Sequence, residues 1–294
     1  MLFPDAQTAV DASAGDTPVH TEGYDVPAAR AAARELAATL PREDVAEVVD
    51  LDVGGVPCRL YRPADALPGV VVHAHGGGFV LNDVEVHDVP SRRLANRAGR
   101  AVLSVDYRLA PEHPYPAAVH DLDAVLGWLD AHGADHGLSG PTYGHGDSAG
   151  AQLVLVAALR HPGRFAALAL IYPFIDPSAS AESHRTETDG LGAADVAWYW
   201  RHYAGDHPDL TDPDLAPLAE AAALATLPPT YVATAEHDPC RDEGEDLARR
   251  VAAAGVETVA TRWLGQPHGF WRHHTAYAAA EPLMQSVVAF LRAH

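Results

Sequence analysis

The feature that most constrains the fold of this chain is an alternation of short apolar runs with longer helical segments. Short apolar runs bounded by Gly or Pro predict buried strands, whereas longer stretches of helix-forming residues predict helices. Strands joined by helices pair in parallel and are covered on both faces, so the pattern predicts an α/β fold with a mostly parallel central sheet flanked by helices. The expected strands are 69–74, 101–105, 141–145, 165–173, 229–235 and 257–263, and the expected helices are 88–98, 117–131, 148–160, 241–254 and 278–293.

Two segments fall outside this alternation. Residues 1–45 contain an Ala-rich helix expected over 27–40, and residues 178–215 are polar before an aromatic helical run, AWYWRHY. Two strands around DVGGVP are expected to form a hairpin within 45–62. The expected organisation is one domain, with a core of about 46–177 and 216–294 and a two-piece lid of about 1–45 and 178–215.

Charge and composition exclude several classes of function. The chain has 40 acidic and 20 basic residues, a net charge of −20, so we expect it to be repelled by nucleic acid and by anionic membrane surfaces. The same charge favours a neutral or cationic substrate over a phosphorylated one. All 20 basic residues are arginine, which excludes a P-loop lysine, a Schiff-base lysine and a Ser-x-x-Lys nucleophile pair. Any general base must therefore be a histidine or a carboxylate.

The sequence predicts a soluble, cytoplasmic protein. Its two cysteines, Cys58 and Cys240, form no Cys-x-x-Cys motif and are too few for a disulfide scaffold. The first residues, MLFPDAQTAVDASAGD, lack the basic and long apolar regions of a signal peptide. No apolar run approaches the roughly 18 residues of a membrane span, so no membrane insertion is expected. The sequence leaves open whether the chain forms a homodimer.

Two glycine clusters follow predicted strands: VVVHAHGGGFV at 70–80 and YGHGDSAGAQLVLV at 143–156. The second contains G-x-S-x-G at 146–150, the pattern of a nucleophile elbow. It also contains G-x-G-x-x-A at 144–149, a dinucleotide-binding fingerprint. Either pattern alone arises readily by chance, so the rest of the chain has to decide between them.

The two motifs make different demands elsewhere in the chain. A dinucleotide site needs an acidic residue about 20 positions later to hold the ribose, but the region RFAALALIYPF supplies none before Asp176. A nucleophile elbow needs an oxyanion loop after an earlier strand, then an acid and a histidine after later strands. All three are present in that order, which favours a hydrolase with Ser148 as the nucleophile.

The first glycine cluster has the properties of an oxyanion loop. Attack on an ester carbonyl develops negative charge on oxygen, which backbone N–H groups stabilise when no Cβ obstructs their approach. We expect Gly76 and Gly77 to supply such donors, together with the N–H of Ala149 at a helix N-terminus. The spacing His73-x-His75 is metal-like, but no third ligand is evident, so we expect no metal and no cofactor.

The acid and the base are expected after the last two predicted strands. Asp238, in TAEHDPCRDEGED, follows the strand at 229–235, and Glu236 is its rival. His268, in GQPHGFW, follows the last strand and is the candidate base, whereas His273 and His274 are expected at the surface.

Taken together, the motifs HGGGF, DYRLAPEHPYPAA, GDSAG, HDPCRDEGE and HGF resemble those of the hormone-sensitive-lipase family of carboxylesterases, over about residues 45 to 290. The resemblance implies an α/β-hydrolase fold with a helical cap formed by the N-terminus and an insertion after the sixth core strand. It implies a serine esterase acting on short-to-medium acyl esters through an acyl-enzyme. By position, Ser148, Asp238 and His268 would be nucleophile, acid and base, and Gly76, Gly77 and Ala149 would form the oxyanion hole.

The chain departs from the family pattern at three places, which bear on the acyl pocket and leave every catalytic group in place. Ala151-Gln152 replaces Gly-Asn after the elbow, Cys240 stands where leucine is usual, and Pro267 precedes the base. The DYRLAPE segment, with Asp106, Arg108 and Glu112, is expected to be structural.

Other functions remain open at this stage. A deacetylase or amidase of a specific metabolite would use the same triad. A non-catalytic receptor on the same fold is disfavoured because the base is present. The aromatic residues of the lid are expected mostly on its buried face, namely Trp198, Tyr199, Trp200 and Tyr203.

Overall fold

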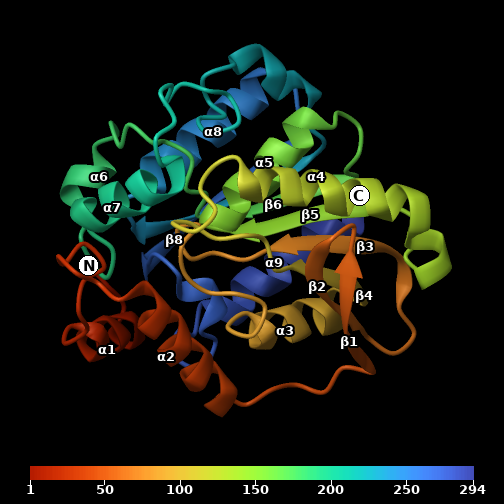
Figure 1. Cartoon of the computed structure of the whole chain (residues 1–294), viewed down its shortest axis with the longest axis horizontal. Coiled ribbons are helices and arrows are strands. Elements are labelled where there is room, and N and C mark those ends of the chain that lie inside the picture. The colour runs from red at the N-terminus through yellow and green to blue at the C-terminus, as the bar shows by residue number, and fades with distance from the viewer.

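The computed structural model describes residues 1–294, apart from the side chain of Ala221. Its centre is an eight-stranded sheet with the order β1-β2-β4-β3-β5-β6-β7-β8 (Figure 1). β1 pairs antiparallel with β2 and β2 with β4, and every later pairing is parallel. The strands are β1 (Glu47–Val53), β2 (Val56–Arg62), β3 (Leu67–Ala74), β4 (Arg100–Val105), β5 (Thr142–Asp147), β6 (Ala167–Ile171), β7 (Thr230–His237) and β8 (Thr258–Pro267).

Helices connect the strands and cover both faces of the sheet (Figure 1). The helices are α1 (Pro4–Ser13), α2 (Val26–Thr39), α3 (Asp88–Ala98), α4 (Ala117–His132), α5 (Ala149–Arg160), α6 (Ser183–Thr186), α7 (Ala193–Ala204), α8 (Arg241–Ala253) and α9 (Ala280–Ala293), with the short 3₁₀ helices η1 (Gly133–His136), η2 (Ala221–Thr226) and η3 (Phe270–Arg272). The mostly parallel sheet flanked by helices is therefore confirmed. None of the described helices is long and apolar enough to cross a membrane.

The largest deviations from the predicted elements lie at strand ends and at the N-terminus. β7 extends to His237 and β8 to Pro267, beyond the expected ends at 235 and 263. The sequence analysis placed the strand ends where the apolar residues stop. The pairing of β7 with β8 continues past that point, through polar residues, as far as the His237–Pro267 pair. Helix α1, which the sequence analysis did not identify, begins with a proline in its first turn.

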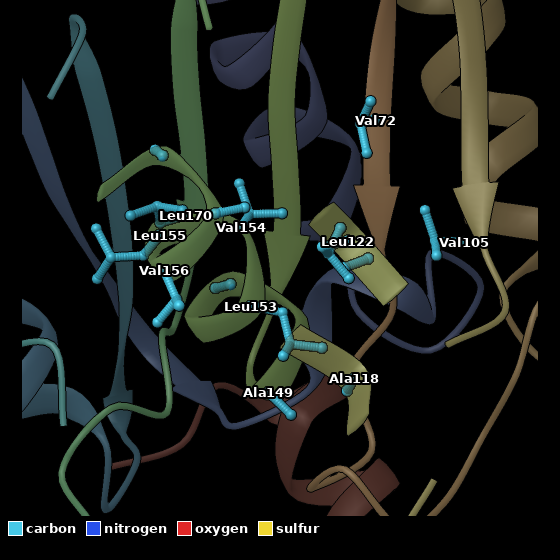
Figure 2. Close-up of a cluster of buried hydrophobic side chains, with 14 of the residues drawn as sticks. Val72, Val105, Ala118, Leu122, Ala149, Leu153, Val154, Leu155, Val156 and Leu170 are labelled. Carbon is cyan, nitrogen blue, oxygen red and sulfur yellow. The ribbon is translucent and has the colours of Figure 1, made fainter. Parts of the chain in front are cut away.

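Two apolar layers hold the helices to the sheet. One layer joins α4, α5 and α8 to one face, and the other joins α3 and α9 to the opposite face. Figure 2 shows side chains of the first layer, with Val154 and Leu155 of α5 beside Leu170 of β6. All ten residues from Ala149 to Ala158 are buried. Each buried Val or Leu contributes roughly 1.5–3 kcal/mol, so the helix that follows Ser148 is firmly fixed.

The two segments expected to form the lid contact one another. The ring of Tyr24 lies edge-on to Trp198 with 5.8 Å between ring centroids. His20 Nδ1 lies 2.7 Å from the Asp195 carboxylate of α7. In Figure 1, α1 and α2 lie on the same side of the molecule as α6 and α7. These contacts place the two segments together.

The DYRLAPE segment packs against the loop after β3 and against the N-terminal helices. The Tyr107 hydroxyl donates to the carbonyl of His75 at 2.6 Å. Arg108 forms a bidentate ion pair with Asp121, and Glu112 accepts from Arg30. These contacts agree with the structural role expected for Arg108 and Glu112.

Candidate active site

Three side chains from the carboxyl ends of three parallel strands form one hydrogen-bonded chain. Ser148 follows β5, Asp238 follows β7 and His268 follows β8. His268 Nε2 lies 2.9 Å from Ser148 Oγ, and His268 Nδ1 lies 2.8 Å from Asp238 Oδ2. The structure thus brings together the three residues that the sequence analysis named as nucleophile, acid and base.

Ser148 occupies a sharp turn between β5 and α5. Its φ of 55° and ψ of −120° lie in a region that L-residues seldom adopt, which is the strained geometry of a nucleophile elbow. The turn is tight because small residues flank it. A Cβ on Gly146 would lie 2.4 Å from the backbone of Gly150, and a Cβ on Gly150 would lie 2.0 Å from the carbonyl oxygen of Ala74. The motif glycines therefore allow the helix to start directly against the sheet.

The carboxylate of Asp238 is fully buried and oriented by two hydrogen bonds. Its Oδ1 accepts the N–H of Cys240 at 2.7 Å, which leaves Oδ2 for His268. Its rival Glu236 faces another group, because its carboxylate accepts the N–H of Gly265 at 2.7 Å. The ring of His268 packs against that of Tyr172, with 4.6 Å between centroids.

The glycine loop after β3 forms one wall of the site, and here one prediction needs correction. The N–H of Gly76 donates to Asp147 Oδ1 at 3.0 Å, so it is already engaged and is not a free oxyanion donor. Within the part of the chain that the structure describes, the N–H groups of Gly77, Gly78 and Ala149 have no acceptor. The sequence could not show this difference, since it depends on where the carboxylate of Asp147, the last residue of β5, meets the loop after β3.

Gly77 and its neighbours fix the shape of this loop. Gly77 has φ of 132°, and a Cβ there would lie 2.1 Å from the carbonyl oxygen of Leu81. The side-chain amide of Asn82 donates to the carbonyl of Gly76 at 3.0 Å. The loop thus requires glycine at this position and is held from two sides.

Asp147 connects the loop to a layer of buried histidines. It is 2% exposed, and its Oδ1 lies 3.3 Å from His87 Nε2. Burial alone would raise the pKa of this carboxyl, but His87, through its charge and hydrogen bond, keeps the pKa below its usual range. The carboxylate therefore stays ionised as the acceptor for the Gly76 N–H.

The histidines of the His73-x-His75 motif have other histidines and aromatic rings as neighbours. His73 Nδ1 lies 2.9 Å from Nδ1 of His145, so one ring donates to the other. His75 stacks on Tyr107 with 4.3 Å between centroids. Burial lowers the pKa of both His75 and His145 to about 4, and it lowers that of His73 still more clearly. These rings are therefore uncharged at neutral pH.

Among the described residues, two groups of side chains have potential metal-ligand atoms within 4.8 Å of one another. One is Asp238, Cys240 and His268, which belongs to the chain described above. The other joins His184, Glu243 and Asp176, in which His184 Nε2 lies 2.7 Å from Glu243 Oε2. Glu243 Oε1 also accepts the N–H of Ile175 at 2.7 Å, and the Asp176 carboxylate accepts from two nearby serines. These hydrogen bonds account for the second group without an ion.

Ser148 and His268 open into a cavity of about 210 Å³ that is also lined by Gly190, Leu191 and Tyr199, from the second segment predicted to form the lid. Tyr199 lines it, whereas Trp198 packs on Tyr24 and Tyr203 stacks on Phe79 at 3.6 Å, so most lid aromatics are structural as expected. The lining includes residues that the sequence analysis did not name: Asn82, Tyr172, Phe174, Leu191 and Arg272. Nothing in their local sequence marks them, since the fold alone brings them to this cavity.

Comparison with known proteins places this geometry in a family. Residues 71–272 match the family model described as the alpha/beta hydrolase fold. The chain is 36% identical over 291 residues to the carboxylic ester hydrolase LipN of Mycobacterium tuberculosis. The aligned region covers 92% of this chain and 77% of LipN.

Solved structures give the same result. An esterase from Pyrobaculum calidifontis superposes with a TM-score of 0.91 at 33% identity, covering 100% of this chain and 99% of that one. An esterase from the bacterial hormone-sensitive lipase family superposes with a TM-score of 0.87 at 29% identity, covering 99% and 98%. The similarity thus extends over the whole chain, including residues 1–45 and 178–215.

Proposed function

Since this chain belongs to the hormone-sensitive-lipase family of α/β-hydrolase carboxylic ester hydrolases, we propose that it hydrolyses short-to-medium acyl esters through a Ser148–His268–Asp238 triad. The observation that supports this most directly is the hydrogen-bonded chain from Asp238 to Ser148 Oγ, which ends in a cavity beside unengaged backbone N–H groups. No metal and no cofactor enters the proposal.

In the proposed reaction Ser148 Oγ attacks the ester carbonyl carbon while His268 Nε2 accepts its proton. Asp238 Oδ2 holds the other ring nitrogen and stabilises the imidazolium that forms. The tetrahedral intermediate then collapses: its carbon–oxygen bond to the alcohol breaks, and His268 gives the alcohol its proton. A water molecule, deprotonated by His268, attacks the acyl-enzyme and releases the carboxylic acid, which restores Ser148.

We assign the oxyanion hole to the N–H groups of Gly77, Gly78 and Ala149. These donors have no acceptor among the described residues, and both glycines line the same cavity as Ser148. Gly76 has a structural role instead, because its hydrogen bond to Asp147 holds the glycine loop next to the turn that carries Ser148. Ala149 adds the favourable end of the α5 dipole.

The size of the cavity supports the proposed acyl range. About 210 Å³ beside Ser148, partly walled by Phe174 and Leu191, suits a small apolar acyl group. A cytoplasmic location remains a prediction of the sequence.

A panel of p-nitrophenyl esters from acetate to dodecanoate tests the proposal, with acetylated amides in the same assay. We expect the highest kcat/KM at short to medium chain length, and a phosphonate inhibitor bound covalently to Ser148. Labelling of a different serine, or no turnover of any ester by folded protein, would refute the triad. Faster cleavage of the amides than of matched acetate esters would instead favour a deacetylase or amidase.

A further inference from the structure

Arg272 differs from the other arginines of this acidic chain. Of the 20 arginines, 18 have a carboxylate or a backbone carbonyl as a partner among the described residues. The two exceptions are Arg201, which is exposed on α7, and Arg272, which is half-buried. The Nε atom of Arg272 is buried with no hydrogen-bond partner. Because no carboxylate or carbonyl of the described residues accepts from it, this half-buried guanidinium is available to an anionic group that enters the cavity.

Arg272 lies in the wall of the proposed active site. It ends the short helix η3, four residues after His268, and it lines the same cavity as Ser148 and Tyr172. It also lines a second cavity of about 630 Å³ between the two lid segments. Because both cavities share Gly190, Leu191 and Tyr199 with Arg272, this side chain lies where the outer cavity meets the inner one.

The nearby carboxylates are engaged elsewhere. Asp147 lies near enough for Arg272 to contribute to lowering its pKa, but no ion pair joins them, and its oxygens face Gly76 and His87. In the outer cavity, Asp195 accepts from His20 and from the N–H of Gly192. Asp189 lies 3.2 Å from His237 Nδ1, and Asp16 is exposed on the N-terminal segment.

We propose that Arg272 is a specificity-determining residue that binds a carboxylate carried by the ester substrate. This inference rests on the esterase function proposed above. A guanidinium binds a carboxylate through two parallel N–H···O bonds, and such charge-assisted bonds are strong where water is excluded. The carboxylate would lie beside Ser148, at the inner cavity, where the single lining carboxylate, Asp147, is held by Gly76 and His87. The outer cavity is lined by three acidic residues, Asp16, Asp189 and Asp195, which disfavour an anion there. The net charge of −20 predicts a neutral or cationic substrate. Charges beyond about 8–10 Å are largely screened at physiological salt, so the guanidinium of Arg272 determines which substrate charge the site prefers.

The carboxylate can belong to the acyl group or to the alcohol, and two matched pairs of esters separate these sources. For the acyl side, monoethyl adipate is compared with its ω-amide, ethyl 6-amino-6-oxohexanoate. For the alcohol side, O-butyryl glycolate is compared with O-butyryl glycolamide. Each pair differs in charge and hardly in size, so the ratio of kcat/KM for acid over amide measures recognition of the carboxylate.

We expect wild-type protein to prefer the acid in one of the two pairs, and Arg272→Gln to reduce that ratio by about tenfold or more, a change of ~1.4 kcal/mol in transition-state binding. Arg272→Lys keeps the charge but loses the two-point geometry, so it should restore part of the ratio. Arg201→Gln is the matched control, because it removes one unpartnered guanidinium from the exposed face of α7 and should leave the ratio unchanged.

Two results with the variants would overturn the inference. One is an acid-to-amide ratio that Arg272→Gln leaves unchanged in both pairs. The other is an equal loss in Arg201→Gln, which would indicate a general charge effect. Inhibition of wild-type p-nitrophenyl butyrate hydrolysis by adipate, with adipamide as the neutral control, adds a measurement that does not depend on the folding of a variant. Equal inhibition by both compounds would also contradict the inference. Failure of the esterase proposal would look different, since no neutral ester would then be hydrolysed.

Discussion

Two histidine–carboxylate pairs have their carboxylates at the start of α8, Asp238 just before the helix and Glu243 in its first turn, and the two pairs have nearly the same distance. His268 and Asp238 are joined at 2.8 Å, and His184 and Glu243 at 2.7 Å. What differs is the second nitrogen of each ring. His268 Nε2 meets Ser148 Oγ beside a cavity, and its side chain is 13% exposed, whereas His184 Nδ1 is buried without a partner.

The comparison shows that a histidine–carboxylate pair alone does not define a catalytic site. The pair must also reach a nucleophile and a space in which a substrate fits. His184 and Glu243 instead join the segment after β6 to α8, because Glu243 also accepts the N–H of Ile175. In the mechanism we propose the first pair moves a proton, whereas the second holds two parts of the chain together.

The largest expected effect comes from removing the nucleophile. Ser148→Ala should lower kcat by about 10⁶-fold, leaving only the residual catalysis of the oxyanion hole and substrate binding. The variant should fold, because Ser148 Oγ contributes little packing, and the His268–Asp238 pair would then resemble the His184–Glu243 pair. Turnover of p-nitrophenyl butyrate, together with the melting temperature, checks this. Near-normal turnover by the folded variant would exclude the proposed mechanism.

The next effect separates two acids that the sequence left as rivals. Asp238→Asn should lower kcat by about 10⁴-fold, because an amide neither holds the required ring tautomer nor stabilises the imidazolium. Glu236→Gln should stay within about tenfold of wild type, since Glu236 faces the N–H of Gly265. Comparing kcat for the two purified variants decides between them. The reverse ranking would transfer the role of acid to Glu236.

Much of this site could be predicted from the sequence, because order along the chain was enough to find Ser148, Asp238 and His268. Parallel strands deliver their carboxyl ends to one edge, so residues after β5, β7 and β8 must meet there. The assignment of Gly76 was wrong because hydrogen bonding between two strand ends decides which N–H remains free. Arg272 could not be found at all, because an unpartnered side chain is a property of its surroundings in the fold.

A smaller effect is expected at the glycine loop. Gly77→Ala should lower kcat by about 10²–10³-fold with little change in KM if its N–H stabilises the oxyanion. The variant should also be less stable, because φ of 132° is unfavourable for alanine and the new Cβ would meet the carbonyl of Leu81. The two effects separate when kcat is expressed per active site, titrated with a covalent serine inhibitor. Full kcat in a destabilised variant would remove Gly77 from the oxyanion hole.

The smallest effect on catalysis is expected at the second pair, where stability should change instead. Burial raises the pKa of Glu243 to about 7. Burial alone would lower the pKa of His184, but the hydrogen bond to Glu243 and the charge of that carboxylate raise it above its ordinary value. A folded-state pKa above the unfolded value means that the native state holds its proton more tightly. The stability from Glu243 is therefore present below about pH 4.5, the ordinary value for Glu, and is lost as pH rises through about 7. The stability from His184 is present below its ordinary value of 6.5 and is lost as pH rises above it.

Glu243→Gln removes this titration and keeps the shape of the side chain. We expect kcat within about threefold of wild type and a loss of ~1–3 kcal/mol in the free energy of unfolding, because a buried hydrogen bond to His184 is weakened. The loss should be larger at pH 5 than at pH 8, since the native pair contributes most where it is protonated. Urea unfolding at the two pH values measures it, with the exposed Glu257→Gln as a control. If Glu243→Gln lowers the free energy of unfolding equally at both pH values, the pair does not exchange a proton on unfolding. If it lowers kcat as much as Asp238→Asn does, the two pairs do not differ in function.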